Sequence, residues 1–493
     1  MFMAEAASFG VALDSVPAPA SEKVASKGKA VSTSGTLLIA GSTDFDNMTS
    51  GNADGIEGFH RVVLESKIAK TYSSSSATHM FVETEDQEVY AYGSNLYGQL
   101  SCGTETTQKW PLRIALPSRV TVKTISTGRY HSLLLSTQGD LYACGSNLKG
   151  QLGLGSQVKF EQISVFTKVN VDGKKAQDCA AGSDFSVCCT TTGRLYTWGN
   201  PECGQLGHGT TGAYFKDGGK GPMLQYDYKY LPILLESMVR KDRYHKDVQQ
   251  YSTTELMFTA VAAGKNHAMA LEAYEGRKEN LGRVFSWGNG AYGRLGHAGA
   301  DDELIPREIT AFSRINAEDG THLPQVASTY QIRHLLGGSS FSLAVSSGGQ
   351  FFHFGKMQSA KKGEPTMYPK MVDDLVSMSA SSRIAAGHNS IFICYDDPQE
   401  VVAWGAPVGG TFGFEGNAKS SVAPKYLEKM SDFKVLDITS SYGSVHVVID
   451  DEDGNKAKVE SLFPELVNET LNSKGKKKGR EMKDGNKAKK AKL

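Results

Sequence analysis

Short apolar runs that end in glycine recur along the chain. They are LLIAG, VYAYG, LYACG, LYTWG, VFSWG, FFHFG and VVAWG, and they end at Gly41, Gly93, Gly145, Gly199, Gly288, Gly355 and Gly405. Successive glycines are 52, 52, 54, 89, 67 and 50 residues apart. Alternating apolar residues over such short runs predict β-strands with one face in a core. The regular spacing predicts a repeated unit with two insertions.

A second motif lies between these runs and also occurs seven times. Its clear copies are TGRYHSLLL, AGSDFSVCC, AGKNHAMAL, GGSSFSLAV and AGHNSIFIC, and its weaker copies are SSATHMFVE and SSYGSVHVV. A third motif, NxxGQLG, follows four of the runs, and we predict that its leucines plug the space between neighbouring sheets. These leucines are Leu100, Leu152, Leu206 and Leu295.

Glycine is frequent in the chain, with 53 residues against 15 prolines, which favours many tight turns and short strands. We expect the glycines of the repeat to supply positive φ or to let strands cross closely. The clearest are Gly93, Gly128, Gly145, Gly182, Gly199, Gly264, Gly288, Gly387 and Gly405. One repeat cannot bury its own apolar face, so the copies must either coil as a solenoid or close radially as a propeller.

The combination of AGxxHS, TxxGxLYxWG and NxxGQLGxG resembles the repeat of the regulator of chromosome condensation family. The resemblance extends over residues 35–455. It implies an all-β fold, a seven-bladed β-propeller closed by N- and C-terminal strands that share one blade. The orphan strand Thr36–Gly41 would then pair with Val445–Asp450, followed by a hairpin at DEDGN, residues 451–455.

The remaining segments flank or interrupt this propeller. We predict a flexible N-terminal arm at 1–34 and a C-terminal extension at 456–493, with disordered termini. The larger insertion spans 210–254, and a minor insertion, predicted to be a plain loop, spans 312–331. In the larger one, the apolar residues Ile233, Leu234, Met238 and Tyr244 have roughly helical spacing. This insertion either binds a partner or decorates its own blade.

Two groups of residues are candidates for partner binding. Tyrosine and arginine anchor interfaces, and the larger insertion supplies Tyr226, Tyr228, Tyr230, Arg240 and Arg243. The family resemblance adds positions at or just before the histidine of the second motif: Tyr130, His131, Asp184, Asn266 and His267.

In the chromatin-bound exchange factor of that family, acidic and histidine side chains on the propeller face promote nucleotide release from a Ran-type small GTPase. Only Asp184 retains an acid at the matching positions here. Because His131 and His267 recur at one repeat position, as His208 and His297 do at another, a packing role in each blade is the alternative for them.

Charge is balanced overall, with 53 basic and 53 acidic residues, so no global field steers the protein to nucleic acid. The tail at 474–493 differs, because it holds ten Lys or Arg against Glu481 and Asp484. Its basic clusters resemble a two-part nuclear localisation signal, and their residues are Lys476, Lys477, Lys478, Arg480, Lys487, Lys489 and Lys490. Alternatively, the tail contacts DNA phosphates without sequence preference or only adds solubility.

We find no sequence pattern for a hydrolytic, redox or metal site. The seven cysteines form no C-x-x-C pair, and we expect reduced, mostly buried thiols. No H-E-x-x-H, Walker A or G-x-S-x-G sequence is present, so we expect neither metal nor cofactor. No apolar run is long enough to span a membrane, so we expect no membrane association.

The sequence therefore predicts a non-catalytic protein-interaction propeller, nuclear and secondarily cytoplasmic, that binds a protein partner through its loop face or the 210–254 insertion. The alternative is a guanine-nucleotide exchange factor for a Ran-type small GTPase, associated with chromatin. Because fold does not fix function, an organellar or cytoskeletal member of the family is a third possibility.

Overall fold

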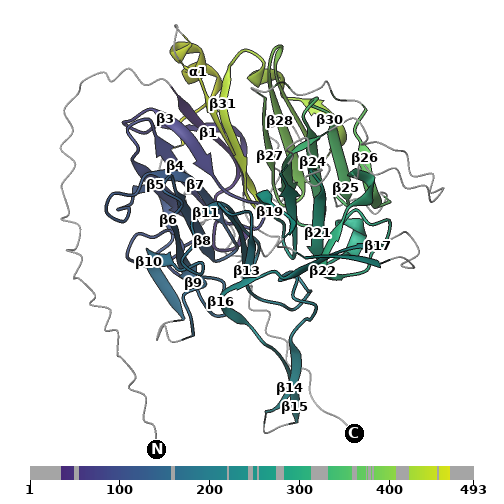
Figure 1. Ribbon diagram of the computed structural model, residues 1–493. Helices are drawn as coiled ribbons and strands as arrows, with labels where there is room; N and C mark the ends of the chain where they lie inside the picture. The colour runs from purple at the N-terminus through teal and green to yellow at the C-terminus, as the bar shows by residue number, and fades with distance from the viewer. Residues whose placement is uncertain are drawn as a thin grey trace, which may run out of the picture. The chain divides into compact units, whose positions relative to one another are not determined.

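The computed structural model describes residues 35–48, 55–156, 161–218, 221–241, 248–252, 255–273, 282–312, 331–357, 364–373, 375, 379, 382–406, 421–451 and 455–466. These residues belong to one compact unit, Thr33–Leu493. Their strands form seven sheets of four or six strands and one separate hairpin (Figure 1). The first strands of successive sheets contact one another in a closed cycle, β3–β7–β11–β19–β23–β27–β31–β3. The fold is thus the predicted seven-bladed β-propeller.

In blades 1, 2, 3, 5 and 6 the strands follow chain order outward from the axis. Blade 1 holds β3 (Ile68–Tyr72), β4 (His79–Thr84), β5 (Val89–Gly93) and β6 (Gln108–Arg113). Blade 2 holds β7 (Val122–Thr127), β8 (His131–Ser136), β9 (Leu141–Ser146) and β10 (Gln162–Val169). Blade 3 holds β11 (Ala176–Ala181), β12 (Phe185–Thr190), β13 (Leu195–Gly199) and β16 (Lys229–Leu234).

Blade 4 has six strands because a second hairpin joins its outer edge. It holds β19 (Phe258–Ala263), β20 (His267–Glu272), β21 (Val284–Gly288) and β22 (Glu303–Glu308), then β17 (Ser237–Lys241) and β18 (Val248–Ser252). Blade 5 holds β23 (Ile332–Gly337), β24 (Phe341–Ser346), β25 (Phe351–Gly355) and β26 (Thr366–Met371). Blade 6 holds β27 (Arg383–Ala386), β28 (Ser390–Asp396), β29 (Gln399–Gly405) and β30 (Ser421–Tyr426).

Blade 7 combines both ends of the propeller. It holds β31 (Val435–Ser440), β32 (Ser444–Ile449), β1 (Thr36–Ser42) and β2 (Gly55–Val62). The separate hairpin is β14 (Ala213–Asp217) with β15 (Pro222–Tyr226). The described helices are α1 (Lys456–Leu462) and the 3₁₀ turns η3 (Ala291–Gly293), η4 (Thr310–Phe312) and η5 (Glu428–Met430).

The hydrophobic core is divided among the interfaces between blades. Seven clusters of buried side chains are found, and each draws residues from two adjacent blades. Leu100, Leu152 and Leu206 lie in three of these clusters, each packed against the next blade. The predicted plugging role of the GQLG leucines is therefore confirmed for these three residues, and Leu295 is likewise buried.

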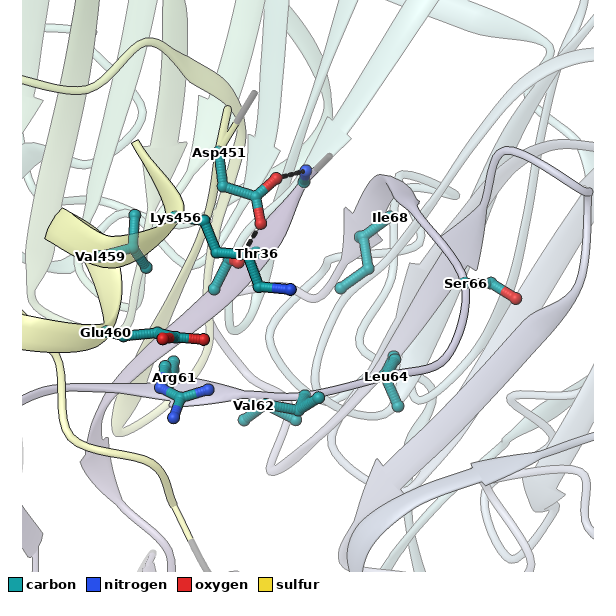
Figure 2. Close-up of a pocket in the computed structure, with 12 residues that line it drawn as sticks. Thr36, Arg61, Val62, Leu64, Ser66, Ile68, Asp451, Lys456, Val459 and Glu460 are labelled. Atoms are coloured by element: carbon teal, nitrogen blue, oxygen red, sulfur yellow. Dashed lines mark hydrogen bonds between the residues drawn. The ribbon is translucent and has the colours of Figure 1, made fainter. Parts of the chain in front are cut away.

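Ring closure follows the prediction, because β1 pairs antiparallel with β32 from Thr36 opposite Ile449 to Gly41 opposite Ser444. The buried Asp451 carboxylate fastens this seam by accepting hydrogen bonds from the Gly35 backbone N–H at 2.7 Å and the Thr36 hydroxyl at 2.8 Å (Figure 2). Most of the predicted DEDGN hairpin, residues 452–454, lies outside the described residues; β32 ends at Ile449 and α1 begins at Lys456. The strand that pairs with β32 to close the blade, β1, comes from the other end of the chain.

The start of the C-terminal extension packs on blade 7. Val459 and Phe463 of the α1 region join the core cluster between blades 6 and 7. Arg61 donates its backbone N–H to the Pro464 carbonyl, and its guanidinium lies 2.8 Å from Glu465. Between α1, β1 and β2 is a cavity of about 100 Å³, lined by side chains that include Arg61, Asp451 and Glu460 (Figure 2). The closing seam is therefore covered by chain that follows the last repeat.

The histidine of the second motif connects blades 1, 2 and 4 each to the following blade. Ser132 Oγ of blade 2 donates to the Gln99 carbonyl of blade 1 at 2.9 Å and lies 2.7 Å from His79 Nε2 of blade 1. Because the Ser132 hydroxyl donates its proton to the Gln99 carbonyl, the hydrogen bond with His79 must be donated by the histidine Nε2–H. His131 with Ser186 and His267 with Ser342 repeat the arrangement. The buried position of these histidines between blades fits the packing role that the sequence offered as the alternative to partner binding.

Two other interfaces carry an apolar pair at these positions. Where the histidine position is Phe185, the serine position of the next blade is Ala268, and both lie in one core cluster. Where it is Phe341, the next blade has Ile391, again in one cluster. These five interfaces therefore match a polar residue with a polar partner or an apolar residue with an apolar partner. Blades 6 and 7 have the buried Ser390 and Ser444 at the histidine position.

The glycine three residues before His131, Phe185, His267 or Phe341 is required sterically. A Cβ at Gly128 would lie 2.1 Å from Cε1 of His131, and one at Gly182 would lie 1.9 Å from Cε1 of Phe185. The ring packs flat on the glycine backbone, so no other residue fits without displacing it.

Asp451→Ala should destabilise the propeller by about 2–3 kcal/mol, because two buried donors at the seam lose their acceptor. The matched control is Glu460→Ala, which removes an exposed carboxylate lining the same cavity and should change stability by less than about 0.5 kcal/mol. Urea denaturation measures both. Equal midpoints for the two variants would show that Asp451 does not fasten the ring.

Acid should weaken the fold through the buried histidines. Burial lowers the pKa of His131 from 6.5 to about 4, with nearby Asp184 opposing the shift, and burial, helped by His131, lowers the pKa of His79 to about 3. Between pH 6.5 and 4 the unfolded chain takes up protons that the folded chain excludes. As the pH is lowered through this range, the free energy of unfolding therefore decreases by about 1.4 kcal/mol per pH unit for each such histidine.

The double variant His131→Phe with Ser186→Ala copies the apolar pair of the next interface. It should reduce the dependence of the unfolding free energy on pH by the contribution of one histidine. Ser186→Ala alone should leave the slope unchanged. Urea titrations at several pH values measure this. A double variant with the wild-type slope would contradict the assignment.

Candidate interaction surface

One end of the ring carries most of the loops that depart from the repeat. Because consecutive strands of a blade run antiparallel, the loop from its first to second strand and the loop from its third to fourth strand lie at the same end. We call this end the insertion face. It comprises the first loops at 73–78, 128–130, 182–184, 264–266, 338–340, 387–389 and 441–443, and third loops whose described residues are 94–107, 147–156, 161, 200–218, 221–228 and 289–302.

The first loops are joined by hydrogen bonds in a ring around the axis. The backbone N–H of Arg129 donates to the Ser183 carbonyl, that of Ser183 to Lys265, and that of Lys265 to Gly338. Ser339 donates to His388, His388 to Ser441, and Tyr442 to Ala77. The hydroxyl of Ser74 completes the circuit by donating to the Thr127 carbonyl. All seven blades are thus linked at this face, which we call the axial ring.

Aromatic and apolar side chains are exposed on the third loops. Leu96, Leu148 and Tyr292 are large apolar residues that remain accessible there. Tyr97 of blade 1 stacks against Tyr130 of blade 2, with ring centroids 4.8 Å apart. Exposed aromatic groups held by such contacts are typical of protein interfaces.

The 210–254 insertion separates into three parts. Its first part is the hairpin β14–β15, which projects from the blades (Figure 1). Next comes β16, which is the ordinary fourth strand of blade 3 and pairs with β13. The last part, β17–β18, extends blade 4 through a parallel contact of Val239 with Arg307. The helical spacing seen in the sequence was misleading, since Ile233, Leu234 and Met238 lie in strands.

Blade 4 holds the β17–β18 hairpin by buried polar contacts. Glu303 accepts from Lys241 and from Arg307, both at 2.7 Å. The Tyr251 hydroxyl of β18 donates to Glu308 at 3.1 Å, and Glu308 is buried. Tyr251 also stacks under the Arg283 guanidinium, 4.8 Å from the ring centroid. This part of the insertion is therefore a fixed extension of its blade.

The β14–β15 hairpin, in contrast, exposes apolar side chains on both of its faces. Phe215 and Leu224 are opposite one another and are 73% and 49% exposed. On the other face Tyr214 and Met223 are 47% and 55% exposed. A two-stranded hairpin has no core of its own, so these four side chains have nothing of this described chain to pack against.

The base of this hairpin is braced by blade 2. The Tyr230 hydroxyl donates to the Leu148 carbonyl at 3.3 Å, and the Gly155 N–H donates to the Tyr230 carbonyl at 2.8 Å. The Asp227 N–H donates a hydrogen bond to the Gly212 carbonyl and so joins the two chain segments at the base of the hairpin. The hairpin therefore leaves the insertion face from an anchored stem.

The predicted binding residues fall into distinct environments. Tyr130, Asp184, Asn266, Tyr226, Tyr228 and Tyr230 all lie on the insertion face or the hairpin stem and are partly exposed. His131 and His267 are fully buried in the interfaces between blades. Arg240 lies in β17 on blade 4, away from the hairpin. Arg243, Tyr244, the interior of the minor insertion and the whole basic tail lie outside the described residues.

Asp184 has a partner within the chain. Its carboxylate lies 2.9 Å from Lys149 Nζ of the preceding blade, and both side chains are partly buried. The one acid retained from the exchange-factor pattern is thus engaged in an ion pair between blades.

Sequence analysis missed the four exposed apolar residues of the hairpin. Their signal was two short alternating runs, AYFKD and PMLQY, on either side of a glycine-rich turn, which is the pattern of a hairpin. It also missed Arg129 and Lys265, because both occupy variable positions of the repeat.

Other chemistry was also searched for within the described ranges. They hold no group of three or more His, Cys, Asp or Glu residues placed to bind a metal, and no described helix is long and apolar enough to cross a membrane. The seven cysteines are free thiols, of which five are buried and Cys102 and Cys203 are partly exposed, as predicted.

Comparison with known proteins agrees with the geometry. The model of the regulator of chromosome condensation (RCC1) repeat matches residues 86–135, 138–189, 192–271 and 282–345. Protein RCC2 of Mus musculus is 30% identical over 453 residues, covering 89% of this chain and 81% of its own. Protein RCC2 of Homo sapiens is 29% identical over the same length, covering 89% and 80%.

Two solved structures share the fold. Human WBSCR16 aligns with a TM-score of 0.62 and 17% identity, over 84% of this chain and 98% of its own. Prp20p from Saccharomyces cerevisiae aligns with a TM-score of 0.59 and 16% identity, over 87% and 94%, and its description names Gsp1p and histones as what it binds. On the repeat motifs, the seven-bladed ring and these matches, the chain belongs to the regulator of chromosome condensation (RCC1) repeat family.

Proposed function

We propose that this chain is a protein-interaction propeller that binds a protein partner through the insertion face, with the β14–β15 hairpin as the main anchor. The observation that carries the proposal is the two-sided exposure of Tyr214, Phe215, Met223 and Leu224. Burying a large apolar side chain contributes about 1.5–3 kcal/mol, so a partner that encloses the hairpin has a strong driving force.

The shape of the element indicates the kind of contact. A hairpin apolar on one face would lie on a flat surface, whereas one apolar on both faces is best buried by insertion into a cleft of the partner. Leu96, Leu148 and Tyr292 are accessible on the same face, Leu148 beside the hairpin stem, and they extend the contact beyond the hairpin. That Prp20p, of the same fold, is described as binding proteins also supports a protein partner.

Nucleotide exchange on a Ran-type GTPase is the second candidate, because a projecting hairpin of this kind suits a wedge against a GTPase. The acids that the family's exchange mechanism uses are reduced to Asp184, which is paired with Lys149. This favours binding without exchange. A fluorescent-nucleotide release assay on a Ran-type GTPase separates the two, since binding alone leaves release at the intrinsic rate.

The double variant Phe215→Ser with Leu224→Ser should weaken partner binding about 100-fold, since each loss in the centre of an interface costs about tenfold or more. The partner is first captured from cell extract and identified, and its affinity is then measured with purified components. The matched control is Tyr368→Ser with Met371→Ser on the outer strand of blade 5, which removes similarly exposed apolar groups. Unchanged affinity in the hairpin variant would refute the anchoring role.

We also propose a nuclear location, supported by the basic clusters of the 474–493 tail. Deleting residues 474–493 should move a fluorescently tagged protein from nucleus to cytoplasm, because the import signal is lost. Microscopy measures the ratio of the two signals. A ratio that does not change would assign the tail another role, such as contact with DNA phosphates.

A further inference from the structure

The centre of the insertion face has its own chemistry. In each blade the residue after the motif glycine, or its equivalent, faces the next blade through the axial ring. These residues are Ala77, Arg129, Ser183, Lys265, Ser339, His388 and Tyr442. Two are permanent cations and none is an acid. Ala77, Ser183 and Ser339 are buried, so the accessible groups at the centre of this face, which we call the axial mouth, are positive and aromatic.

The two cations are not neutralised within the described part of the chain. Neither Arg129 nor Lys265 lies within ion-pair distance of a described carboxylate. The acid next along the loops, Asp184, is paired with Lys149 at 2.9 Å. Lys265 is exposed and Arg129 partly exposed, so both are accessible to a ligand.

Arg129 is held in place before any ligand arrives. Its guanidinium carbon lies 4.9 Å above the Tyr130 ring, which itself stacks on Tyr97. Its Nε is buried and has no hydrogen-bond partner among the described residues. An arginine stacked in this way loses little entropy when its donors bind a carboxylate.

The opposite side of the mouth carries a second aromatic pair. His388 and Tyr442 have ring centroids 3.9 Å apart. Burial, helped by Lys265, lowers the pKa of His388 to about 4. Burial raises the pKa of Tyr442, and Arg129 opposes this rise. Arg129 and Lys265 therefore lie close enough to this pair to act on it electrostatically.

We propose that this axial mouth binds carboxylate side chains of an acidic segment in the protein partner, with Arg129 and Lys265 as the recognising groups. The inference rests on the proposed function of the insertion face and names the partner's chemistry at its centre. A nucleic acid fits less well, because such binding uses many cations along a backbone path, whereas the axial mouth has two cations among its described residues, one of them over the Tyr130 ring.

The test uses the full chain and a fluorescein-labelled oligoglutamate peptide as the probe. Fluorescence anisotropy should show binding that weakens about tenfold for each of Arg129→Gln and Lys265→Gln, since each loses a charge-assisted contact. Lys109→Gln, the same charge change on the exposed outer strand of blade 1, should have no effect. Carbodiimide, which joins a carboxylate to a lysine in contact, should link the probe to Lys265.

Three results would overturn the proposal. The first is equal binding of the probe by the Lys265→Gln and Lys109→Gln proteins, and the second is cross-links confined to lysines of the 474–493 tail. The third is an oligothymidylate that displaces the peptide and whose binding requires Arg129. The Phe215→Ser, Leu224→Ser protein should bind the probe normally. Retained partner binding in this hairpin variant would count against the hairpin anchor alone. Partner and probe binding that both stay at the wild-type level in the Lys265→Gln protein would count against the acidic-segment assignment alone.

Discussion

The structure depends on hydrogen bonds that cross from one blade to the next. The carbonyls of Gln99 and Gln151 each accept a serine hydroxyl from the following blade, and Gln151 also accepts the Trp198 indole N–H at 2.9 Å. No blade buries both of its faces alone, so stability arises at interfaces, as in other repeat proteins. The same contacts place seven loops in register around the axis. The insertion face is consequently a rigid platform, and the elements that depart from the repeat are carried by it.

The residues that hold the fold together and the residues proposed to bind a partner occupy different positions of the repeat. Residues that several copies share, such as the histidines and the GQLG leucines, are buried and hold the ring together. Residues that differ between copies, such as Arg129 and Lys265, meet at the axis and face solvent. The two hairpins of the insertion show the same division. β17–β18 is fixed to blade 4 by Glu303 and Glu308, whereas β14–β15 presents Phe215 outward.

Repetition made the fold predictable, because seven copies of a motif average out local ambiguity. The pairing of Thr36 with Ile449 across the whole chain followed from one missing half-repeat. The insertion had no copies to compare. Ile233, Leu234 and Met238 satisfy a helical period over too few residues to exclude strands, and the open edges of blades 3 and 4 decided the outcome. The axial mouth could not be predicted from the sequence either, since only ring closure brings variable residues from distant repeats together. Asp451 lay in a turn-like sequence whose partner, Gly35, is at the other end of the propeller.

Native-state hydrogen exchange at the axial ring tests the central claim most directly. The amides of Arg129, Ser183, Lys265, His388 and Tyr442 donate across blades, although they lie in loops. If the ring is one closed unit, they should exchange as slowly as amides of the second strands and with a common dependence on denaturant. Rapid exchange that varies from blade to blade would contradict this and would mean that the loops move independently instead of forming one platform.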